Sequence, residues 1–531
     1  MTPGTLWSAP RWLAFLVLAF VLLAGSAMLR TSTTFDEMGF VASGARGLRS
    51  GDFSLVNDHP RLAQYLYGMP IYLSEVNYPP EEGRNWSRYY YAQALLWESG
   101  NRPERIAMSA RLVGLAFGAF AVVATFLLAR RHMEDGAALL AAGLLALMPD
   151  FIAHSGVAYN DVPLAFALLL AVYALDAMVR APTPARGALA GLACALVACI
   201  KYSGLVVVPI LAALLALEAL SGRWRARDWW VGLVRSGSSF VLAGYGAIVV
   251  IYLGDWRLEE FRAGLAALEQ ATSTGRVAFL LGERNLSGSG WWYFFPVALA
   301  LKTPVALHVL ALVALGAAVV AARGAHWREW LVHGARAPAA AAAIFLAALM
   351  ASRFNIGVRH ALPLLPFACI LVAHGVAAVW KAGATPLRWA LGLTTAAFAA
   401  SGLAQYPHFL SYLNAYAYGR TSAETLVDSN TDWGQGLVAL GEFMRARGIE
   451  SVALAYFGSA LPEGYGIRYV PLPSFMPLRP QPPGAEPRYI VISATLLAGM
   501  YVRGDPYAHL RAHVPVAVLA GSLYVFDREA L

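Results

Sequence analysis

Two adjacent carboxylates, Asp36 and Glu37, directly follow the first apolar segment of the chain. A carboxylate beside a lipid interface is partly desolvated, which makes it a better proton acceptor than a carboxylate in open water. The pair is therefore a candidate general base at a membrane surface. The alternative is structural: Thr33 or Thr34 caps a short surface helix, and Glu37 is its capping partner.

A third acid, Asp161, lies at the start of a later apolar segment, directly before Val162 and Pro163. Charged side chains at membrane depth are costly and mark candidate sites. Asp161 is therefore a second candidate catalytic carboxylate. The alternative is a helix cap, with Pro163 in the first turn of the helix.

Five basic residues accompany these acids within or beside apolar segments: Lys201, Lys302, Arg353, Arg359 and His360. Fixed cations that face the acids would bind a phosphate or pyrophosphate and stabilise it as a leaving group. We therefore predict that they bind a donor phosphate. The alternatives are lysines that snorkel to the interface and arginines that contact lipid headgroups.

His59 and Arg61 lie in the same loop as the acidic pair, in the run Asp58-His59-Pro60-Arg61, and form a candidate substrate loop. A lone histidine is more often structural. The sequence has no CxxC spacing and most of its histidines are scattered, so no metal and no cofactor are expected, although a divalent ion is not excluded. It also has no GxSxG elbow and no phosphate-binding glycine loop, which disfavours hydrolases and nucleotide-using enzymes.

Composition places these residues in a membrane protein. Of 531 residues, 58% are hydrophobic and 14% are charged, which is far from a soluble globular composition. The net charge of +8 is spread in short arginine clusters between apolar segments and forms no single basic face. The expected partner is therefore the lipid bilayer and not nucleic acid.

The apolar runs predict a polytopic α-helical protein with about eleven transmembrane helices. The stretch Gly187–Leu220 is broken only by Lys201, but basic residues flank both ends, so it is expected to cross twice. Basic loops alternate along the chain, which predicts a cytoplasmic N-terminus and an extracytoplasmic C-terminus. The runs are Trp12–Leu29, Ile106–Ala129, Ala137–Ile152, Val162–Val179, Gly187–Ile200, Tyr202–Leu220, Trp229–Leu253, Trp292–Ala322, Pro338–Ala351, Ala361–Val379 and Trp389–Leu403.

We divide the chain into a transmembrane domain, 1–405, with outer loops 31–105 and 254–291, and an extracytoplasmic α/β domain, 406–531. In the second domain, Asp432 and Gln435 are expected to form a capping box before a helix over Leu437–Arg447. Three short β-rich runs follow at Ser451–Phe457, Tyr489–Ser493 and Leu523–Phe526.

The order of these motifs resembles that of the GT-C membrane glycosyltransferases. Within them the chain is similar to the protein O-mannosyltransferase group and its bacterial relatives, which include the lipid A aminoarabinose transferase. The motifs that carry the resemblance are Asp36-Glu37 with His59-Pro60, Asp161-Val162-Pro163, Arg359-His360-Ala361-Leu362-Pro363, Trp291-Trp292-Tyr293-Phe294-Phe295-Pro296 with Lys302-Thr303-Pro304, and Asp428-Ser429-Asn430-Thr431-Asp432-Trp433-Gly434-Gln435.

The resemblance implies transfer of a hexosyl or pentosyl group from a polyprenyl-phosphate donor to an extracytoplasmic acceptor, with inversion and without a nucleotide sugar. It implies that Asp36 is the general base, that no metal is required, and that the protein lies in a bacterial inner membrane. Arg61 stands where relatives often have a second proline, so the acceptor (protein, lipid or glycan) does not carry over. The sequence does not define the oligomeric state.

Two other functions are consistent with a membrane protein of this kind. A lipid-linked sugar flippase or exporter would place its polar groups along a path through the membrane, whereas the polar groups here are predicted on one side. A non-catalytic assembly subunit would leave Asp36 dispensable.

Overall fold

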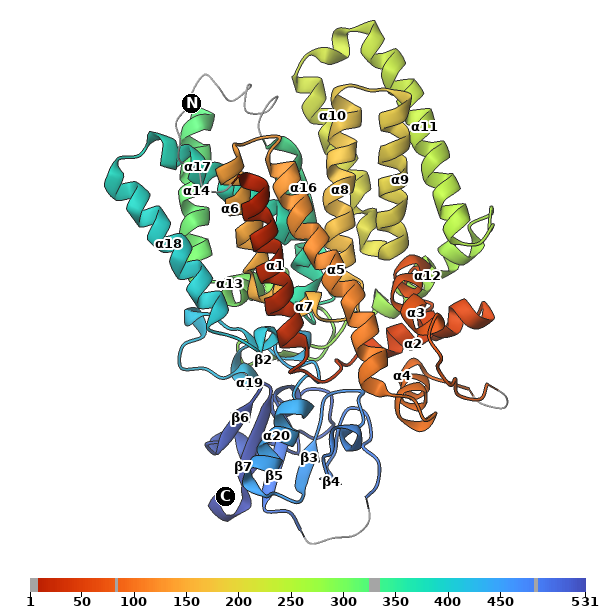
Figure 1. Ribbon diagram of the computed structural model, residues 1–531, viewed down its shortest axis with the longest axis vertical. Helices are drawn as coiled ribbons and strands as arrows, with labels where there is room; N and C mark the ends of the chain where they lie inside the picture. Colours follow the sequence, from red (N-terminus) through yellow and green to blue (C-terminus); the bar gives the residue numbers. More distant parts are fainter. Residues whose placement is uncertain (1–7, 82–84, 324–334, 482–485) are drawn as a thin grey trace.

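A bundle of long helices carries a small β-sheet at one of its ends (Figure 1). The structure is a computed structural model and describes residues 8–81, 85–323, 335–481 and 486–531. Helix α1 begins on the side of the bundle away from the sheet, and the C-terminus lies within the sheet region.

Every apolar run predicted from the sequence forms a helix or a pair of consecutive helices. The described residues contain seven helices long and apolar enough to cross a membrane, or eight if the bent pair α6 and α7 forms one span. A polytopic helical membrane protein is thus confirmed, while about eleven crossings stays a prediction. The helices are α1 Ala9–Met28, α5 Pro103–Ala129, α6 Asp135–Ala146, α7 Pro149–Ser155, α8 Asp161–Arg180, α9 Pro184–Ile200, α10 Val207–Leu220, α11 Arg227–Ile251, α13 Phe294–Lys302, α14 Val305–Arg323, α16 Arg336–Ala351, α17 Leu365–Ala382 and α18 Thr385–Leu403.

The long stretch Gly187–Leu220 forms two helices, as predicted. Lys201 has an extended backbone (φ −156°, ψ 133°) and ends α9, and the 3₁₀ turn η3 over Tyr202–Val206 leads into α10. Lys201 therefore lies in the break between α9 and α10 and inside neither helix.

Short helices cover the sheet end of the bundle: α2 Glu37–Ser50, α3 Arg61–Tyr72, α4 Arg88–Gln93 and α12 Glu259–Ser273. The antiparallel hairpin of β1 Ala278–Leu280 and β2 Glu283–Asn285 follows α12. Helices α2 and α3 cross so closely that a Cβ on Gly44 would lie 2.1 Å from the carbonyl oxygen of Gln64. Glycine at this crossing therefore fixes α2, the helix that follows Asp36.

The C-terminal region forms a five-stranded sheet in the order β4-β3-β5-β7-β6. Strand β3 is parallel to β4 and β5, and β7 is antiparallel to β5 and β6. Each of the three predicted strands is present, and the helix α20 has the predicted bounds Leu437–Arg447. The strands are β3 Val452–Ala455, β4 Tyr469–Pro471, β5 Tyr489–Ser493, β6 Ala517–Leu519 and β7 Leu523–Asp527.

The predicted capping box at the start of α20 is wrong. Gly436 is the N-cap residue. The Gln435 side chain instead accepts a hydrogen bond from the backbone N–H of Trp433 at 2.7 Å, and Asp432 accepts one from the backbone N–H of Thr495 at 2.8 Å. Gln435 therefore holds the 428–435 segment together, Asp432 ties this segment to Thr495, and neither side chain caps the helix.

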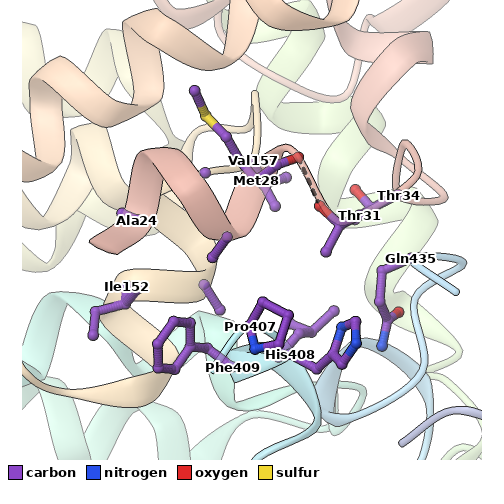
Figure 2. A pocket seen from close by; sticks show the side chains of 14 residues that line it. Ala24, Met28, Thr31, Thr34, Ile152, Val157, Pro407, His408, Phe409 and Gln435 are labelled. Carbon is purple, nitrogen blue, oxygen red and sulfur yellow. Dashed lines mark hydrogen bonds between the residues drawn. The ribbon is translucent and has the colours of Figure 1, made fainter. Parts of the chain in front are cut away.

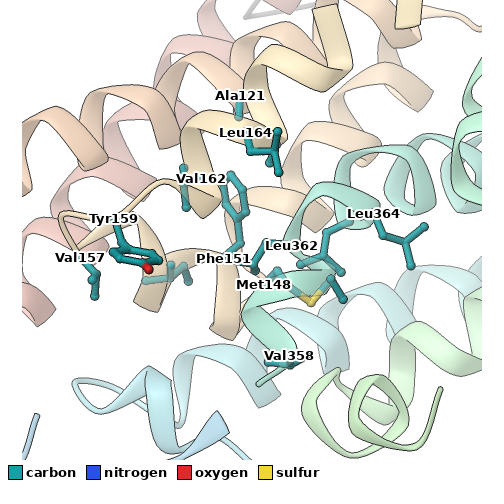
Figure 3. Close-up of a cluster of buried hydrophobic side chains, with 14 of the residues drawn as sticks. Ala121, Met148, Phe151, Val157, Tyr159, Val162, Leu164, Val358, Leu362 and Leu364 are labelled. Atoms are coloured by element: carbon teal, nitrogen blue, oxygen red, sulfur yellow. The ribbon is translucent and has the colours of Figure 1, made fainter. Parts of the chain in front are cut away.

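Buried apolar side chains join the start of α8 to η5, the 3₁₀ helix over Val358–Leu364 (Figure 3). Phe151 of α7, Val162 and Leu164 of α8, and Val358 and Leu362 of η5 are all fully or almost fully buried. Asp161 begins α8 and Arg359 follows Val358, so this cluster positions both elements for the polar groups described below.

Candidate active site

Asp36 lies in the turn before α2 with its carboxylate partly open, at 23% side-chain exposure. Its Oδ1 accepts a hydrogen bond from the phenol of Tyr89 at 3.2 Å, and its Oδ2 accepts one from Nη2 of Arg359 at 3.1 Å. Burial and the neighbouring Asp36 carboxylate raise the pKa of Tyr89, so this phenol stays protonated and donates. Asp36 is thus oriented by two donors and still reachable by a substrate hydroxyl.

The guanidinium of Arg359 is held from several directions. Its Cζ lies 4.9 Å from the ring centroid of Tyr159 and 4.4 Å from that of Trp433, and these two rings are nearly perpendicular to each other. Its Nε donates to the hydroxyl of Ser429 at 3.2 Å, and its Nη1 lies 3.7 Å from Oδ2 of Asp161. The two cation–π contacts and a charged hydrogen bond fix the direction of its remaining N–H groups.

Lys201 and His360 extend this polar cluster. The ammonium of Lys201 forms an ion pair with Oδ1 of Asp161, and Nδ1 of His360 lies 3.5 Å from the ammonium nitrogen. The buried side-chain atoms of the described residues that lack a hydrogen-bond partner include Nε2 of His360 and Nη1 of Arg359, whose contact with Asp161 is an ion pair at 3.7 Å and not a hydrogen bond. Unpaired buried donors are costly unless a ligand accepts from them, and phosphate oxygens are strong acceptors.

Five predicted site residues therefore come together from distant parts of the chain. They are Asp36, Asp161, Lys201, Arg359 and His360.

His59 reaches the same cluster through Tyr159, whose hydroxyl lies 3.0 Å from Nε2 of the histidine. On its other side, His59 lies 3.2 Å from Asp58, which also pairs with Arg88 at 2.9 Å. Burial favours the neutral acid, but the hydrogen bonds from His59 and Arg88 outweigh it and hold the pKa of Asp58 below its usual value. His59 and Arg61 both line a cavity of about 290 Å³. The predicted substrate loop thus borders an open volume beside the cluster.

Glu37 does not share the environment of Asp36, contrary to the prediction that it is catalytic. Its side chain is 0% exposed, and Arg111 donates to both of its carboxylate oxygens, at 2.7 and 2.9 Å. Backbone N–H groups of Ala158 and Thr34 donate to the same carboxylate at 3.0 and 2.9 Å. A buried carboxylate with four donors has no free position for a substrate proton, so Glu37 is structural. The contact with Thr34 is one part of the capping alternative, but the N-cap residue of α2 is Asp36 and not a threonine.

Two of the predicted phosphate-binding cations also lie outside the cluster. The ammonium of Lys302 is fully buried, and it contacts Asp150 at 3.0 Å and the carbonyl oxygens of Leu410 and Asn430 at 2.7 and 2.6 Å. Its three N–H groups are therefore used within the protein. Arg353 is exposed, and the described part of the chain provides no ion pair for it. Neither residue has the geometry that the prediction required.

Four residues of the cluster were not predicted as site residues: Tyr89, Tyr159, Ser429 and Trp433. Ser429 and Trp433 belong to the motif Asp428–Gln435, which carries the family resemblance but was expected only to cap the following helix. The unusual run of polar residues around one tryptophan was a signal for them. No sequence signal distinguished Tyr89 and Tyr159 from the many other aromatic residues of the chain.

A smaller cavity lies between the end of α1, α7 and residues 407–410 (Figure 2). Met28, Val157 and Phe409 line it, and Figure 2 shows Thr31 hydrogen-bonded to the carbonyl of Met28. Its volume of about 30 Å³ suits one or two water molecules and no sugar. None of the predicted site residues lines it.

Within the described ranges, no three His, Cys, Asp or Glu side chains are grouped as a metal site. The expectation of a metal-independent protein stays a prediction.

Residues 13–258 match the family model of the dolichyl-phosphate-mannose-protein mannosyltransferases. The resemblance to this GT-C group is confirmed. The matched region contains Asp36, His59, Asp161 and Lys201, whereas Arg359 lies beyond it. No curated protein matches the sequence closely enough to count as a relative.

Two solved structures are similar in overall architecture. ArnT from Cupriavidus metallidurans, solved with undecaprenyl phosphate, is 12% identical, with 98% of each chain covered and a TM-score of 0.49. The archaeal oligosaccharyltransferase AglB from Archaeoglobus fulgidus, solved with an inhibitory peptide and a dolichol-phosphate, is 13% identical with a TM-score of 0.44. In that second comparison, 75% of this chain and 56% of the other are covered.

Proposed function

We propose that this protein transfers a sugar from a polyprenyl-phosphate donor to an acceptor hydroxyl outside the cytoplasm, with inversion. The observation that carries the proposal is the contact between Asp36 and Arg359 at 3.1 Å, beside the Lys201–Asp161 ion pair. In one displacement reaction, a carboxylate can accept the proton of the incoming hydroxyl while a neighbouring cationic cluster stabilises the departing phosphate.

In the proposed reaction, the donor phosphate accepts hydrogen bonds from Arg359 and Lys201 and thereby releases Asp36 from its ion pair. Asp36 takes the proton of the acceptor hydroxyl as that oxygen attacks the anomeric carbon. The bond between this carbon and the phosphate oxygen breaks, and the electron pair stays on the polyprenyl phosphate, whose added charge the two cations stabilise. The products are the glycosylated acceptor and polyprenyl phosphate, with the proton on Asp36.

A flippase or exporter fits the polar groups less well. A second buried ion-pair cluster exists, in which Arg336 contacts Asp176 at 3.0 Å and Glu218 at 2.5 Å. Asp161 and Asp176 lie toward opposite ends of α8, and the buried side chains between them are all apolar except Tyr173. Transport needs polar groups along the whole path, and this packing favours two separate clusters.

The proposed orientation puts the site, the sheet and the C-terminus outside a bacterial inner membrane and the N-terminus in the cytoplasm. The alternation of basic loops supports it. A reporter that is active only outside the cytoplasm, fused after Leu531, is expected to be active. Activity of a cytoplasm-only reporter at that position would contradict the orientation.

The decisive experiment uses the purified full chain in liposomes with a panel of radiolabelled polyprenyl-phosphate sugars and an envelope extract. We expect one donor to label an acceptor fraction, and Asp36→Asn to abolish labelling while donor binding persists. Labelling that is independent of Asp36 would refute the catalytic proposal. No labelling with any donor, together with sugar-lipid movement across the liposome, would favour the flippase.

A further inference from the structure

A cavity of about 260 Å³ lies between α4 and the C-terminal region. Trp86, Tyr90 and Gln93 line it from the first outer loop, and Met476 and Arg479 line it from the segment that follows β4. Tyr90 is 49% exposed, so the cavity is an open cleft that water-borne molecules can reach.

The two walls of this cleft continue to Asp36. On the α4 wall, Tyr89 donates to the Asp36 carboxylate and packs edge-on against the ring of Phe35 at 4.9 Å. On the opposite wall, Phe475 lies 5.5 Å from the same Phe35 ring and is 45% exposed. Both walls therefore converge at the residue next to Asp36.

Hydrogen bonds also tie the cleft to this position. The side-chain amide of Gln93 donates to the carbonyl of Ser459 at 2.8 Å, and the hydroxyl of Ser459 donates to the carbonyl of Phe35 at 2.6 Å. A molecule that contacts Gln93 is thus two hydrogen bonds from the backbone that positions Asp36.

The residues that line the cleft suit an uncharged sugar. The exposed ring of Tyr90 offers an aromatic surface against which the C–H face of a sugar ring packs, and Gln93 is a polar neighbour. The cleft's two charged side chains, Glu98 and Arg479, form an ion pair with each other, so it presents no excess charge to an anionic acceptor. A peptide can bind through its backbone by adding a strand to a sheet edge. No residue lining the cleft belongs to a strand, so the cleft does not offer this mode of peptide binding.

We propose that this cleft is a distal acceptor subsite, which binds an uncharged sugar of a glycan acceptor near the hydroxyl that reacts at Asp36. The inference rests on the proposed transferase function and adds the acceptor class to it. A side-chain layer of Phe35 and Tyr89 separates the cleft from the carboxylate, so the bound sugar is a neighbour of the reacting one.

The test measures transfer by the full chain in liposomes against increasing amounts of an envelope glycan extract. Tyr90→Ala should raise the extract concentration needed for half-maximal transfer about threefold to tenfold, as expected for the loss of one aromatic contact. Affinity for the lipid-linked donor should stay at the wild-type value. Tyr418→Ala removes a tyrosine that is 93% exposed and outside the cleft, so it is the matched control.

Two treatments of the extract test the acceptor class. Protease digestion should leave its acceptor capacity intact, and periodate oxidation, which cleaves sugar rings with neighbouring hydroxyls, should abolish it. The reverse pattern would overturn the glycan acceptor in favour of a protein.

The experiments distinguish a failure of the cleft proposal from a failure of the proposed transferase function. If wild-type protein transfers sugar in an Asp36-dependent way but Tyr90→Ala and Trp86→Phe keep the wild-type dependence on extract, the cleft proposal is overturned and the transferase proposal stands. If wild-type protein transfers nothing from any donor, both are overturned.

Discussion

Asp36 and Glu37 are adjacent, yet their isosteric amides should have opposite effects. Glu37 accepts hydrogen bonds from Arg111 at 2.7 and 2.9 Å and is 0% exposed, so Glu37→Gln leaves a buried guanidinium without its counter-ion. Removing one partner of a buried ion pair costs about 3–5 kcal/mol. Asp36 is 23% exposed and meets Arg359 through one N–H group, so Asp36→Asn should leave the free energy of unfolding almost unchanged.

The effects on turnover should be reversed. Loss of a positioned general base lowers the transfer rate by about 10²-fold to 10⁴-fold, so Asp36→Asn should be folded and almost inactive. The fraction of Glu37→Gln protein that remains folded should keep a rate within a few-fold of wild type. The assays are thermal unfolding in detergent and transfer rate per folded molecule at saturating donor. A stable but inactive Glu37→Gln protein, or a fully active Asp36→Asn protein, would refute the assignment.

Three further predictions concern the cations and one buried acid. Arg359→Ala should weaken donor binding by about 1.5–3 kcal/mol, the range for a charged hydrogen bond, with only partial rescue by Lys, whereas Arg353→Ala should bind donor like wild type in the same titration. Lys302→Met should lower the free energy of unfolding by about 3–5 kcal/mol, because Asp150 is left buried and unpaired. The folded fraction of this variant should keep the wild-type affinity for the donor. A large loss of donor affinity with normal stability would instead assign Lys302 to the phosphate site. Burial raises the pKa of Asp432 to about 7, so the folded state binds this proton more tightly than the unfolded state. That contribution to stability is complete below about pH 4 and is lost as the pH rises through 7, and Asp432→Asn should flatten this part of the unfolding profile.

The hydrophobic pattern predicted the fold well because burial of apolar runs decides where helices form in a membrane protein. It located the break at Lys201, whereas the bounds of α20 were predicted correctly from a capping box that the structure does not contain. The pattern could not assign different roles to Asp36 and Glu37, because these neighbouring carboxylates differ in their tertiary contacts and not in their local sequence. Arg111, the partner of Glu37, lies 74 positions away, and no local pattern links them.

Local sequence was also insufficient to distinguish the roles of Lys201 and Lys302. Lys201 and Lys302 both interrupt apolar sequence, and position alone gives them equal claims to a phosphate. The structure gives Lys201 one carboxylate and a histidine at the edge of the cluster, but surrounds Lys302 with three oxygen acceptors. The packing of Lys302 argues against a role in phosphate binding, because a buried ammonium needs its own partners, and backbone carbonyls from far along the chain supply them.

Lys302 nevertheless acts on the site through the C-terminal region. We propose domains at 1–405 and 406–531, but the candidate site draws on both. Lys302 binds the carbonyl of Asn430 at 2.6 Å, and the amide of Asn430 accepts a hydrogen bond from the backbone N–H of Val358 at 2.8 Å. The first contact anchors the 428–435 segment to α13, and the second joins it to η5 at the residue before Arg359, whose guanidinium contacts Ser429 and Trp433. Arg359 is long and flexible and, unsupported, would lose rotamer entropy on meeting a phosphate. Under the proposed mechanism, the C-terminal region would therefore hold the proposed phosphate-binding group in place before the donor arrives.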